Sequence, residues 1–511
     1  MYGVTSPLSA EAGRASGPCQ PRAAGLIARH PDLWALALIV AVALALRLGF
    51  FLNAPPFFEG DARGYLVRAV EIPSGPKLNF SSKATGGYPL FIAAVFAVGE
   101  PSLQAIVFAQ HLLGVGSSLA AYLAARTLAG RLAGLLAGLA TAASGSALIY
   151  EHVILTEALF GCLLAAGTAL LLIGLRRRSL RWYVAAGATM GIATLVRPVA
   201  LALLPLAMAP ILLRPQWRRA LLAGASYALS FGLVLLVWSL GVVRNSSENT
   251  PVHPGQTLVE RTLRHSGADV SMYADPGSPT DPPLIRAGRR VLRDIEPEQP
   301  SAFEVRAALA RRLNLSDAEA SRLAWQVAAD AVRRHPDLYL AGTWDQLVKL
   351  IIGDDESVAR HVGRRSAWKG KDLERVSEEG MLPPSLSEPE LPPDEALGLA
   401  ELMGHLYQPS GWMVAILAGC GLALYWAVRD TSRRPVLLPL SAAAILAVCT
   451  VAMTGSLPRY RYPLDPLLHV AAAAGIVWTI GVLLERRVPG RGLLARPSRP
   501  RAGARASRPP R

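Results

Sequence analysis

The hydrophobic pattern of this chain is a series of long apolar runs separated by short polar connections. A helix needs roughly 20 apolar residues to cross the hydrocarbon core of a bilayer. The pattern therefore predicts an all-α polytopic membrane protein with about 10 transmembrane helices, in a range of about 8–13. The predicted spans are Leu33–Leu52, Leu103–Ala125, Leu132–Ile149, Ile154–Leu175, Trp182–Val196, Val199–Leu213, Ala220–Val242, Gly411–Val428, Val436–Val451 and Leu464–Leu484.

Positive charge is concentrated beside these apolar runs. The chain has 52 Lys and Arg against 37 Asp and Glu, a formal net charge of +15. If the N-terminus is cytoplasmic, the basic connections at 126–131, 176–181, 214–219 and 433–434 all lie on the cytoplasmic side, as the positive-inside rule requires. Arginines in such positions orient a membrane protein, so we exclude nucleic acid as a partner. We expect an inner or plasma membrane protein with both termini cytoplasmic.

This orientation divides the chain into five parts, and the two terminal parts are too polar to form a packed core. The predicted parts are a disordered tail at 1–32, a transmembrane core at 33–243 that includes a first outer loop at 53–101, an outer segment at 244–410 with interfacial helices, transmembrane helices at 411–485 and a basic disordered tail at 486–511.

Two helices are predicted within the outer segment. Ser316 and Glu319 have the spacing of a capping box, which predicts that a helix over Ser316–Arg334 begins there. The apolar stretch Leu338–Ile352 is too short for a comfortable crossing, so we expect it to lie at the membrane surface.

The cysteines indicate neither a disulfide framework nor a structural metal. Cys162, Cys420 and Cys449 lie inside apolar runs, and Cys19 lies in the N-terminal tail. The sequence has no Cys-x-x-Cys pair and no Cys/His spacing typical of a zinc site.

The first outer loop carries the strongest candidate for chemistry. Glu59, Asp61, Arg63 and Tyr65 follow closely after the first span, where charge near the membrane surface is costly. A carboxylate in this position could accept a proton from an incoming hydroxyl, so Asp61 is a candidate general base, with Glu59 beside it to polarise it or to help hold a divalent ion. An ordinary hydrated loop explains the same composition equally well.

Further polar residues are predicted on the same side of the membrane. Lysine and arginine can bind phosphate, whereas acids and aromatic residues can bind the hydroxyls of a sugar. Membrane-surface anchoring by lysine and helix-dipole stabilisation of Glu157 are the non-functional alternatives. The candidates are Lys83 after Lys77, Tyr88, His152, Glu157, Arg197, Arg244, Asn245, Arg459 and Arg461.

Taken in order, these motifs resemble the GT-C class of membrane glycosyltransferases, and above all the dolichyl-phosphate-mannose–protein mannosyltransferase-like and aminoarabinose-transferase-like families. The resemblance extends over about Leu33 to Leu484. Its motifs are Asp61…Tyr65, Gly87-Tyr88-Pro89-Leu90, Leu155-Thr156-Glu157-Ala158, Leu195-Val196-Arg197-Pro198, Val243-Arg244-Asn245, His335-Pro336 with Tyr339, and Arg459-Tyr460-Arg461-Tyr462-Pro463.

The resemblance implies an inverting transfer of a sugar from a polyprenyl-phosphate carrier to a lipid, glycan or protein acceptor at the outer face of the membrane. The implied catalytic residues are Asp61 and Glu59, which would also be the ligands of any Mg or Mn ion. The implied donor-phosphate ligands are Lys83, Arg459, Arg461 and Arg63, and the implied sugar or acceptor contacts are Tyr65, Tyr88, Glu157, His152, Arg244 and Asn245. Many relatives have an Asp-Glu pair in this loop, whereas Ala62 follows Asp61 here.

Three other functions compete with this interpretation. An O-antigen ligase or polymerase would place the chemistry in the outer segment, at Arg261, Arg264 or His265. A lipid or sugar transporter would place charged residues at mid-bilayer on broken helices, and the predicted spans are nearly free of charge at their centres. A structural membrane scaffold would leave the acidic first loop unexplained.

Overall fold

The computed structural model of the chain describes residues 31–57, 61–72, 86–213, 216–242, 255–263, 272–273, 280–296, 302–352, 386, 409–454 and 458–487. Within these residues the regular structure is helical, and the only strand-like feature is one isolated parallel bridge between Phe57 and Val153. The predicted all-α polytopic membrane fold is therefore confirmed.

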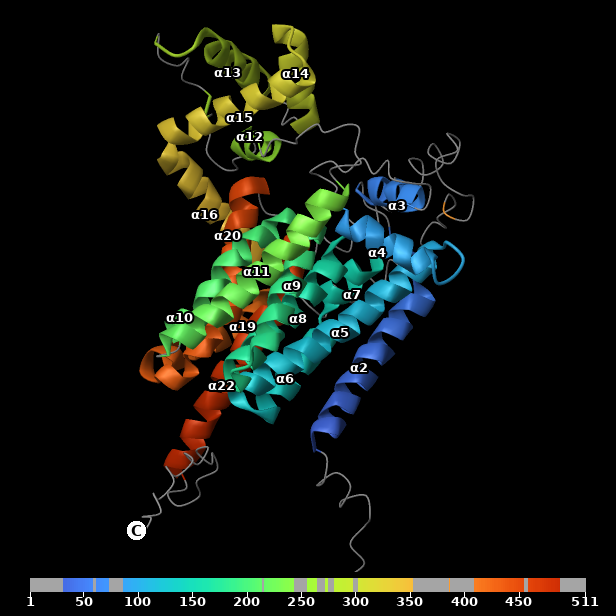
Figure 1. Cartoon of the computed structure of the whole chain (residues 1–511), viewed down its shortest axis with the longest axis vertical. Helices are drawn as coiled ribbons and strands as arrows, with labels where there is room; N and C mark the ends of the chain where they lie inside the picture. The colour runs from blue at the N-terminus through green and yellow to red at the C-terminus, as the bar shows by residue number, and fades with distance from the viewer. Residues whose placement is uncertain are drawn as a thin grey trace, which may run out of the picture.

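The transmembrane part is a bundle of long apolar helices (Figure 1). Seven helices of the described residues are long and apolar enough to cross a membrane, or eight with the bent pair α6–α7. The bundle contains α2 (Pro31–Asn53), α5 (Leu103–Ala129), α6 (Arg131–Ala142), α7 (Gly145–His152), α8 (Glu157–Arg177), α9 (Leu180–Val196), η2 (Pro198–Met208), α10 (Ala209–Leu213), α11 (Trp217–Val242), α19 (Pro409–Arg429), η6 (Thr431–Val436), α20 (Leu437–Thr454) and α22 (Asp465–Arg487).

All ten predicted spans are found as helical segments, but two of them are irregular. The span predicted at Leu132–Ile149 is broken near Ser144, where α6 and α7 meet at 48°. The span predicted at Trp182–Val196 is a regular α-helix of 17 residues. The span predicted at Val199–Leu213 begins as a 3-10 helix of 11 residues that contains Pro205. Proline removes a backbone donor, which explains why no regular α-helix forms there.

Glycines allow some helices of the bundle to pack with their backbones in contact. A Cβ atom at Gly187 of α9 would lie 2.1 Å from the carbonyl oxygen of Tyr227 in α11. A Cβ atom at Gly475 of α22 would lie 2.2 Å from the carbonyl oxygen of Gly419 in α19. Small residues at such crossings are typical of membrane helices, because lipid provides no hydrophobic force between them.

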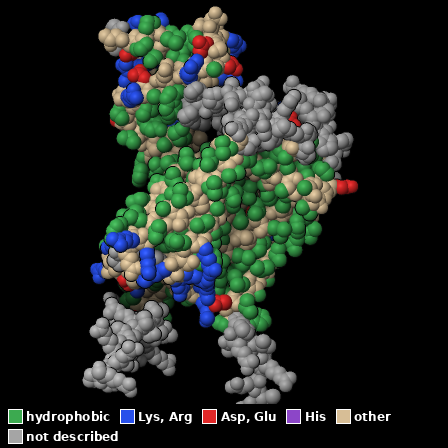
Figure 2. Space-filling model, viewed as in Figure 1, with side chains coloured by type: hydrophobic (Ala, Val, Ile, Leu, Met, Phe, Trp, Pro, Cys, Tyr) green, Lys and Arg blue, Asp and Glu red, His purple; other side chains and the backbone are tan. Residues whose placement is uncertain are grey.

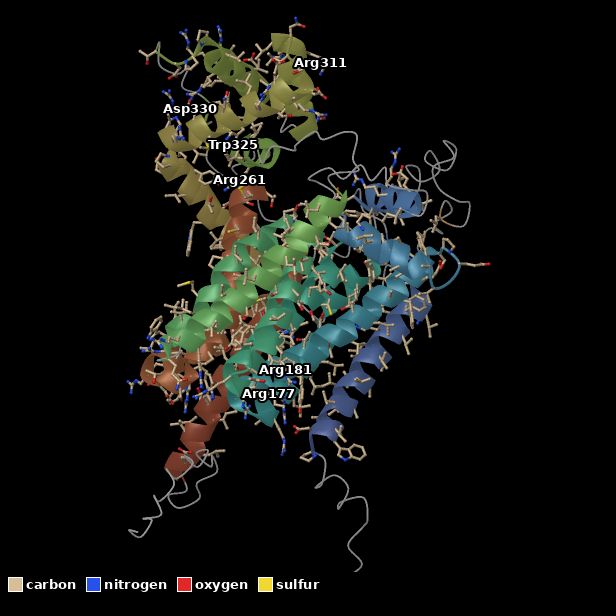
Figure 3. All side chains as sticks on the ribbon, viewed as in Figure 1. Arg177, Arg181, Arg261, Arg311, Trp325 and Asp330 are labelled. Atoms are coloured by element: carbon tan, nitrogen blue, oxygen red, sulfur yellow. The ribbon has the colours of Figure 1, made fainter. Side chains whose placement is uncertain are left out.

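The surface of the bundle has the polarity expected of a membrane protein. Apolar side chains cover the sides of the helices, and basic side chains gather at one end (Figure 2). Arg177 and Arg181 lie at this basic end (Figure 3), whereas α3 (Ala62–Glu71) and α4 (Gly87–Phe96) lie toward the opposite end (Figure 1). The chain is thus a multi-pass membrane protein, and which end faces the cytoplasm stays a prediction.

A helical lobe stands above the end of the bundle opposite the basic one (Figure 1). It consists of α12 (Gly255–Leu263), α13 (Pro283–Ile295), α14 (Ala302–Leu313) and α15 (Asp317–Arg334), and its own core includes Val259, Leu292, Leu309 and Val327. The predicted capping box is present: the Ser316 side chain accepts from the Glu319 amide, and Glu319 accepts from the Ser316 amide. The following helix, α16 (Pro336–Ile352), returns the chain to α20.

Candidate active site

Four charged side chains from distant parts of the sequence meet at the end of the bundle near α3. Asp61 precedes α3, Glu157 begins α8, Arg197 ends α9 and Arg459 lies in α21 (Pro458–Arg461). Arg459 Nη2 lies 3.2 Å from Asp61 Oδ2, and Arg197 Nη1 lies 2.8 Å from Glu157 Oε1. Arg459 Nε is 3.8 Å from the same Glu157 oxygen, so the four groups form one continuous ionic cluster.

The four side chains differ in their exposure in a way that suits a binding site. The Asp61 side chain is 58% exposed, whereas that of Glu157 is only 2% exposed. Arg459 and Arg197 lie between these extremes, at 16% and 19%. Glu157 can therefore act as the buried anchor that orients both arginines, while Asp61 stays accessible to a molecule arriving from outside.

Aromatic rings form the walls of this ionic cluster. The ring of Tyr460 lies 4.7 Å from the guanidinium of Arg197 and 5.3 Å from that of Arg459, which restricts both cations. Tyr65 of α3 is buried and packs edge-on against Tyr88 of α4, with ring centroids 5.0 Å apart. Burial, and secondarily the Asp61 and Glu157 carboxylates, raise the pKa of Tyr65 well above its usual value, so its hydroxyl stays protonated.

A short backbone connection sets the position of the segment that leads to Asp61. The amide of Phe57 donates to the carbonyl oxygen of His152 at 3.1 Å, and the amide of Ile154 donates to that of Phe57 at 3.1 Å. This bridge joins the end of α2 to the α7–α8 connection, which leads directly to Glu157. The backbone segments that precede the two carboxylates in the sequence are therefore paired with each other.

A second polar network lies fully buried inside the bundle. Arg47 Nη2 of α2 donates to Glu151 Oε1 at 2.8 Å, and His111 Nδ1 of α5 lies 3.1 Å from Glu151 Oε2. Gln110 donates to the carbonyl oxygens of Glu151 and Val153, each at 2.9 Å. Pairing of this kind is what makes buried charge tolerable inside a membrane protein.

Three of the predicted ligand contacts belong to this buried interior. His152 is fully buried and contacts His111, and the Tyr88 hydroxyl donates to Gln110 Oε1 at 2.6 Å. Arg461 is 2% exposed and its Nε lies 3.5 Å from Asp465 Oδ1. The geometry thus favours Arg459 over Arg461 for direct contact with a phosphate, and the ligand roles of Tyr88, His152 and Arg461 stay predictions.

Four of the predicted site residues lie outside the described residues, and a fifth, Arg63, lies at the start of α3. Glu59, Lys83, Arg244 and Asn245 fall outside the described part of the chain. Arg63 lies partly buried in the first turn of α3. Among the described residues no group of three or more His, Cys, Asp or Glu side chains could hold a metal ion, so a Mg or Mn ion at Glu59 and Asp61 stays a prediction.

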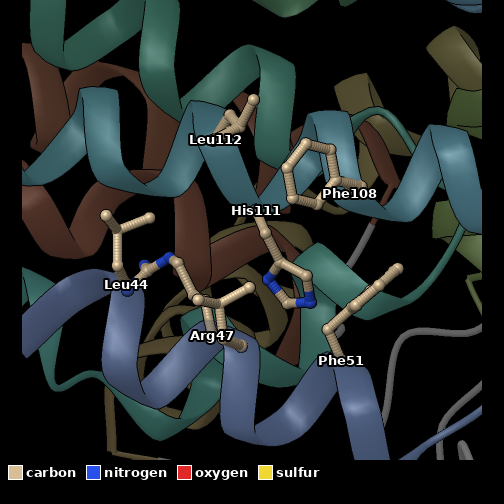
Figure 4. A pocket seen from close by; sticks show the side chains of 7 residues that line it. Leu44, Arg47, Phe51, Phe108, His111 and Leu112 are labelled. Carbon is tan, nitrogen blue, oxygen red and sulfur yellow. The ribbon is translucent and has the colours of Figure 1, made fainter.

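A shallow apolar groove runs between α2 and α5, close to the buried network (Figure 4). Its cavity volume is about 10 Å³, room for about one water molecule, and Arg47 and His111 lie among its lining residues with Leu44, Phe51 and Phe108. Hydrocarbon side chains dominate its walls, and the space is too small for a ligand.

The buried partners of Glu151 are not evident from the sequence. Gln110 and His111 are polar residues within an apolar run, and the rule that intramembrane polar residues are seldom accidental could have drawn attention to them. Arg47 lies near the end of the first predicted span. Its pairing with Glu151 joins residues 104 positions apart, which local pattern does not reveal.

The comparisons with known proteins agree with this architecture. Residues 86–242 match the family described as dolichyl-phosphate-mannose-protein mannosyltransferase. No curated protein matches the chain.

Two of the similar solved structures contain a lipid phosphate. The oligosaccharyltransferase AglB of Archaeoglobus fulgidus, in complex with an inhibitory peptide and a dolichol-phosphate, is 12% identical with a TM-score of 0.49 over 91% of this chain and 53% of that one. ArnT of Cupriavidus metallidurans, bound to undecaprenyl phosphate, is 16% identical with a TM-score of 0.36 over 88% of this chain and 79% of that one. The chain spans about half the length of AglB.

The support for a GT-C-type bundle is the match of residues 86–242 to the dolichyl-phosphate-mannose-protein mannosyltransferase family. The resemblance predicted from the motifs of the sequence is confirmed over that segment, which includes the Glu157 and Arg197 motifs.

Proposed function

We propose that the chain is a membrane glycosyltransferase that moves a sugar from a polyprenyl-phosphate carrier to an acceptor, with inversion at the anomeric carbon. The observation that carries this proposal is the convergence of Asp61, Glu157, Arg197 and Arg459 at one end of the bundle. The family matched by residues 86–242 is named for a donor of this class, dolichyl-phosphate-mannose. The acceptor group is a hydroxyl, an amine or a phosphate of a lipid, glycan or protein.

The chemistry of such a transfer requires a base on one side and cations on the other. Asp61 accepts the proton of the acceptor hydroxyl as its oxygen attacks the anomeric carbon. The bond from that carbon to the phosphate oxygen breaks, and the carrier phosphate leaves as an anion. No acid is needed to protonate it, because Arg459 and Arg197 stabilise its negative charge.

Arg459 is suited to link these two events, since it contacts Asp61 in the structure. A phosphate that arrives between Arg459 and Arg197 would replace the ion pair with Asp61 and release that carboxylate to serve as the base. Glu157 would keep the two guanidinium groups in position, as it lies within reach of both. The donor would thus prepare the base that the acceptor needs.

The orientation of the protein follows from its charge distribution. Basic side chains gather at the end of the bundle away from α3 (Figure 2), and the positive-inside rule assigns that end to the cytoplasm. The ionic cluster would then face the periplasmic or extracellular side.

The alternative of an O-antigen ligase or polymerase receives less support from the described residues. Of its three candidates, Arg261 is 1% exposed and donates to the carbonyl oxygen of Val451 at 3.0 Å, a structural contact. Arg264 and His265 lie outside the described residues. No observation favours the transporter over the transferase.

A transfer assay with a panel of donors tests the proposal. Membranes that contain the protein are incubated with radiolabelled polyprenyl-phosphate sugars, each with a different sugar, and incorporation into endogenous acceptors is measured. We expect label to be transferred from one donor, with release of the polyprenyl phosphate. If the protein consumes none of the donors while a nucleotide-sugar is used directly, the proposed donor class is wrong.

A further inference from the structure

Glu151, His111 and His152 form a line of hydrogen bonds through the interior of the bundle. Glu151 Oε2 lies 3.1 Å from His111 Nδ1, and His111 Nε2 lies 3.0 Å from His152 Nδ1. At the end of the line, His152 Nε2 lies 2.9 Å from each of the carbonyl oxygens of Ala54 and Pro55. All three side chains of the line are at most 3% exposed.

The number of hydrogens in this line follows from its geometry. A carbonyl oxygen can only accept, so His152 Nε2 carries a hydrogen. The other two links, from carboxylate to imidazole and from imidazole to imidazole, each need one hydrogen as well. Three hydrogens are required, whereas a carboxylate and two neutral imidazoles supply only two. The line therefore holds one extra proton.

The neighbours of Glu151 decide where this proton resides. Arg47 Nη2 donates to Glu151 Oε1 at 2.8 Å, which stabilises the ionised carboxylate and leaves the extra proton to the histidines. Phe50 and Phe57 pack edge-on against the His152 ring, and Phe51 packs similarly against His111. Among the described residues, Tyr462, Cys162, Asp465 and His469 are further titratable groups near Glu151.

We infer that His111 and His152 together hold one proton more than two neutral imidazoles, and that this proton fixes the segment leading to Asp61 against α7. His152 Nε2 donates to the carbonyl oxygens of Ala54 and Pro55, and the Phe57 amide donates to the carbonyl oxygen of His152. His111 and His152 are thus positioning residues for the first outer loop.

Loss of the proton would place two acceptor atoms opposite each other at one link of a buried line. Such an unsatisfied pair is unfavourable, so the hydrogen bonds of the line would break and residues 54–57 would be held less firmly against His152. The proton count does not depend on the proposed function. Only the consequence for sugar transfer rests on it, through the role of Asp61.

The variant Glu151→Gln should keep the three hydrogen bonds of the line without the extra proton, so it tests the proton alone. A glutamine amide nitrogen can donate to His111 Nδ1, and its oxygen can accept from Arg47. All three links then persist with two neutral imidazoles. Glu151→Leu, in contrast, removes the first link entirely. The chain has nine histidines, so a difference between variants isolates the signal of this pair.

Nitrogen-15 NMR of histidine-labelled full-length protein in bilayers measures the number of protonated histidine ring nitrogens at neutral pH. We expect the wild-type protein to show one more protonated ring nitrogen than Glu151→Gln, and Glu71→Gln on the exposed end of α3 to match wild type. Hydrogen exchange at the amides of Phe57 and Ile154 should be slow in wild type and Glu151→Gln and faster in Glu151→Leu.

Equal counts of protonated ring nitrogens in wild type and Glu151→Gln would overturn the inference, whatever the transfer assay shows. Equal exchange in all three proteins would overturn the positioning role. Neither readout requires a substrate, so failure of the proposed function would leave both results interpretable.

Discussion

Arg459 is the residue on which the ionic cluster depends most directly. It contacts both carboxylates, Asp61 at 3.2 Å and Glu157 at 3.8 Å, and its guanidinium lies 5.3 Å from the ring of Tyr460. A planar group with several donors can bind a phosphate and a carboxylate at once, which the ammonium of lysine does less well. This single side chain would couple departure of the donor phosphate to activation of the acceptor.

Replacement of Arg459 tests this coupling. We expect Arg459→Ala to lower kcat for sugar transfer by about 100-fold or more, because a donor to the leaving phosphate is lost in the transition state. Arg459→Lys should retain part of the activity. Arg131→Ala, at an exposed arginine paired with Asp32, is the matched control and should transfer at the wild-type rate. An Arg459→Ala enzyme with unchanged kcat would show that this side chain does not contact the phosphate.

Gly114 of α5 is required for a different reason, the space that Glu151 occupies. A Cβ atom at this position would lie 2.0–2.4 Å from the Glu151 carboxyl group. We expect Gly114→Ala to displace the carboxylate from Arg47 and to destabilise the protein by about 3–5 kcal/mol, the usual cost of breaking a buried ion pair. A thermal unfolding scan in detergent measures the difference.

The control for this prediction is Gly49→Ala in α2. A Cβ atom there would meet no atom within 4 Å, so the substitution should change stability by no more than about 0.5 kcal/mol. Similar unfolding temperatures for both glycine variants would mean that the Glu151 site tolerates the extra carbon.

At the scale of the elements, helix ends are stabilised by individual side chains. The lobe helix α15 begins with the capping box of Ser316 and Glu319, whereas Ser179 at the start of α9 makes no side-chain capping bond. We expect Ser316→Ala to destabilise α15 by about 1 kcal/mol, and Ser179→Ala to have a smaller effect. Hydrogen exchange over the first turns of the two helices compares them, and equal protection losses would refute the assignment of the cap.

Sequence alone predicted the elements well because membrane spans are read from composition. Every predicted span is helical in the structure, and the capping box of α15 was visible as a local motif. The break between α6 and α7 was not predicted, since Ala142, Ala143 and Ser144 continue an apolar, small-residue run. The cause of the bend lies partly in Ser144, whose side chain accepts from the Ala147 amide and so begins a new helix.

The site was predictable in part. Asp61, Glu157, Arg197 and Arg459 each stood out as charged residues near the ends of apolar runs, but no local pattern indicated that they meet. The inward direction of Arg461 was unpredictable too, because Arg459 and Arg461 share one short turn and differ only in which face of it they occupy. Long-range packing decides which of the two remains accessible.

At the scale of the whole molecule, the lobe and the helix that follows it, α16, are joined to the bundle at α20, the helix that precedes Arg459. Arg261 Nε donates to the carbonyl oxygen of Val451 at 3.0 Å, and the Tyr339 hydroxyl donates to that of Ala452 at 2.6 Å. Both acceptors belong to the last turn of α20, a few residues before Arg459. The lobe can therefore influence the position of the arginine that the site requires.

Removal of one hydroxyl tests this connection. We expect Tyr339→Phe to speed hydrogen exchange in the last turn of α20, with a loss of about 1 kcal/mol of local stability. Tyr425→Phe, at a half-exposed ring on α19, is the matched control and should leave α20 unchanged. If both variants exchange like wild type, the lobe and the bundle are coupled through other contacts.

The measurement that tests the account most directly is sugar transfer by Asp61→Asn. The two proteins to compare with wild type are this variant and Glu71→Gln, which alters an exposed carboxylate at the far end of α3, the helix that follows Asp61. If Asp61 is the base, Asp61→Asn should fold and insert normally but transfer about 10²- to 10⁴-fold more slowly, while Glu71→Gln keeps the wild-type rate. Transfer by Asp61→Asn at the wild-type rate would contradict the proposed mechanism.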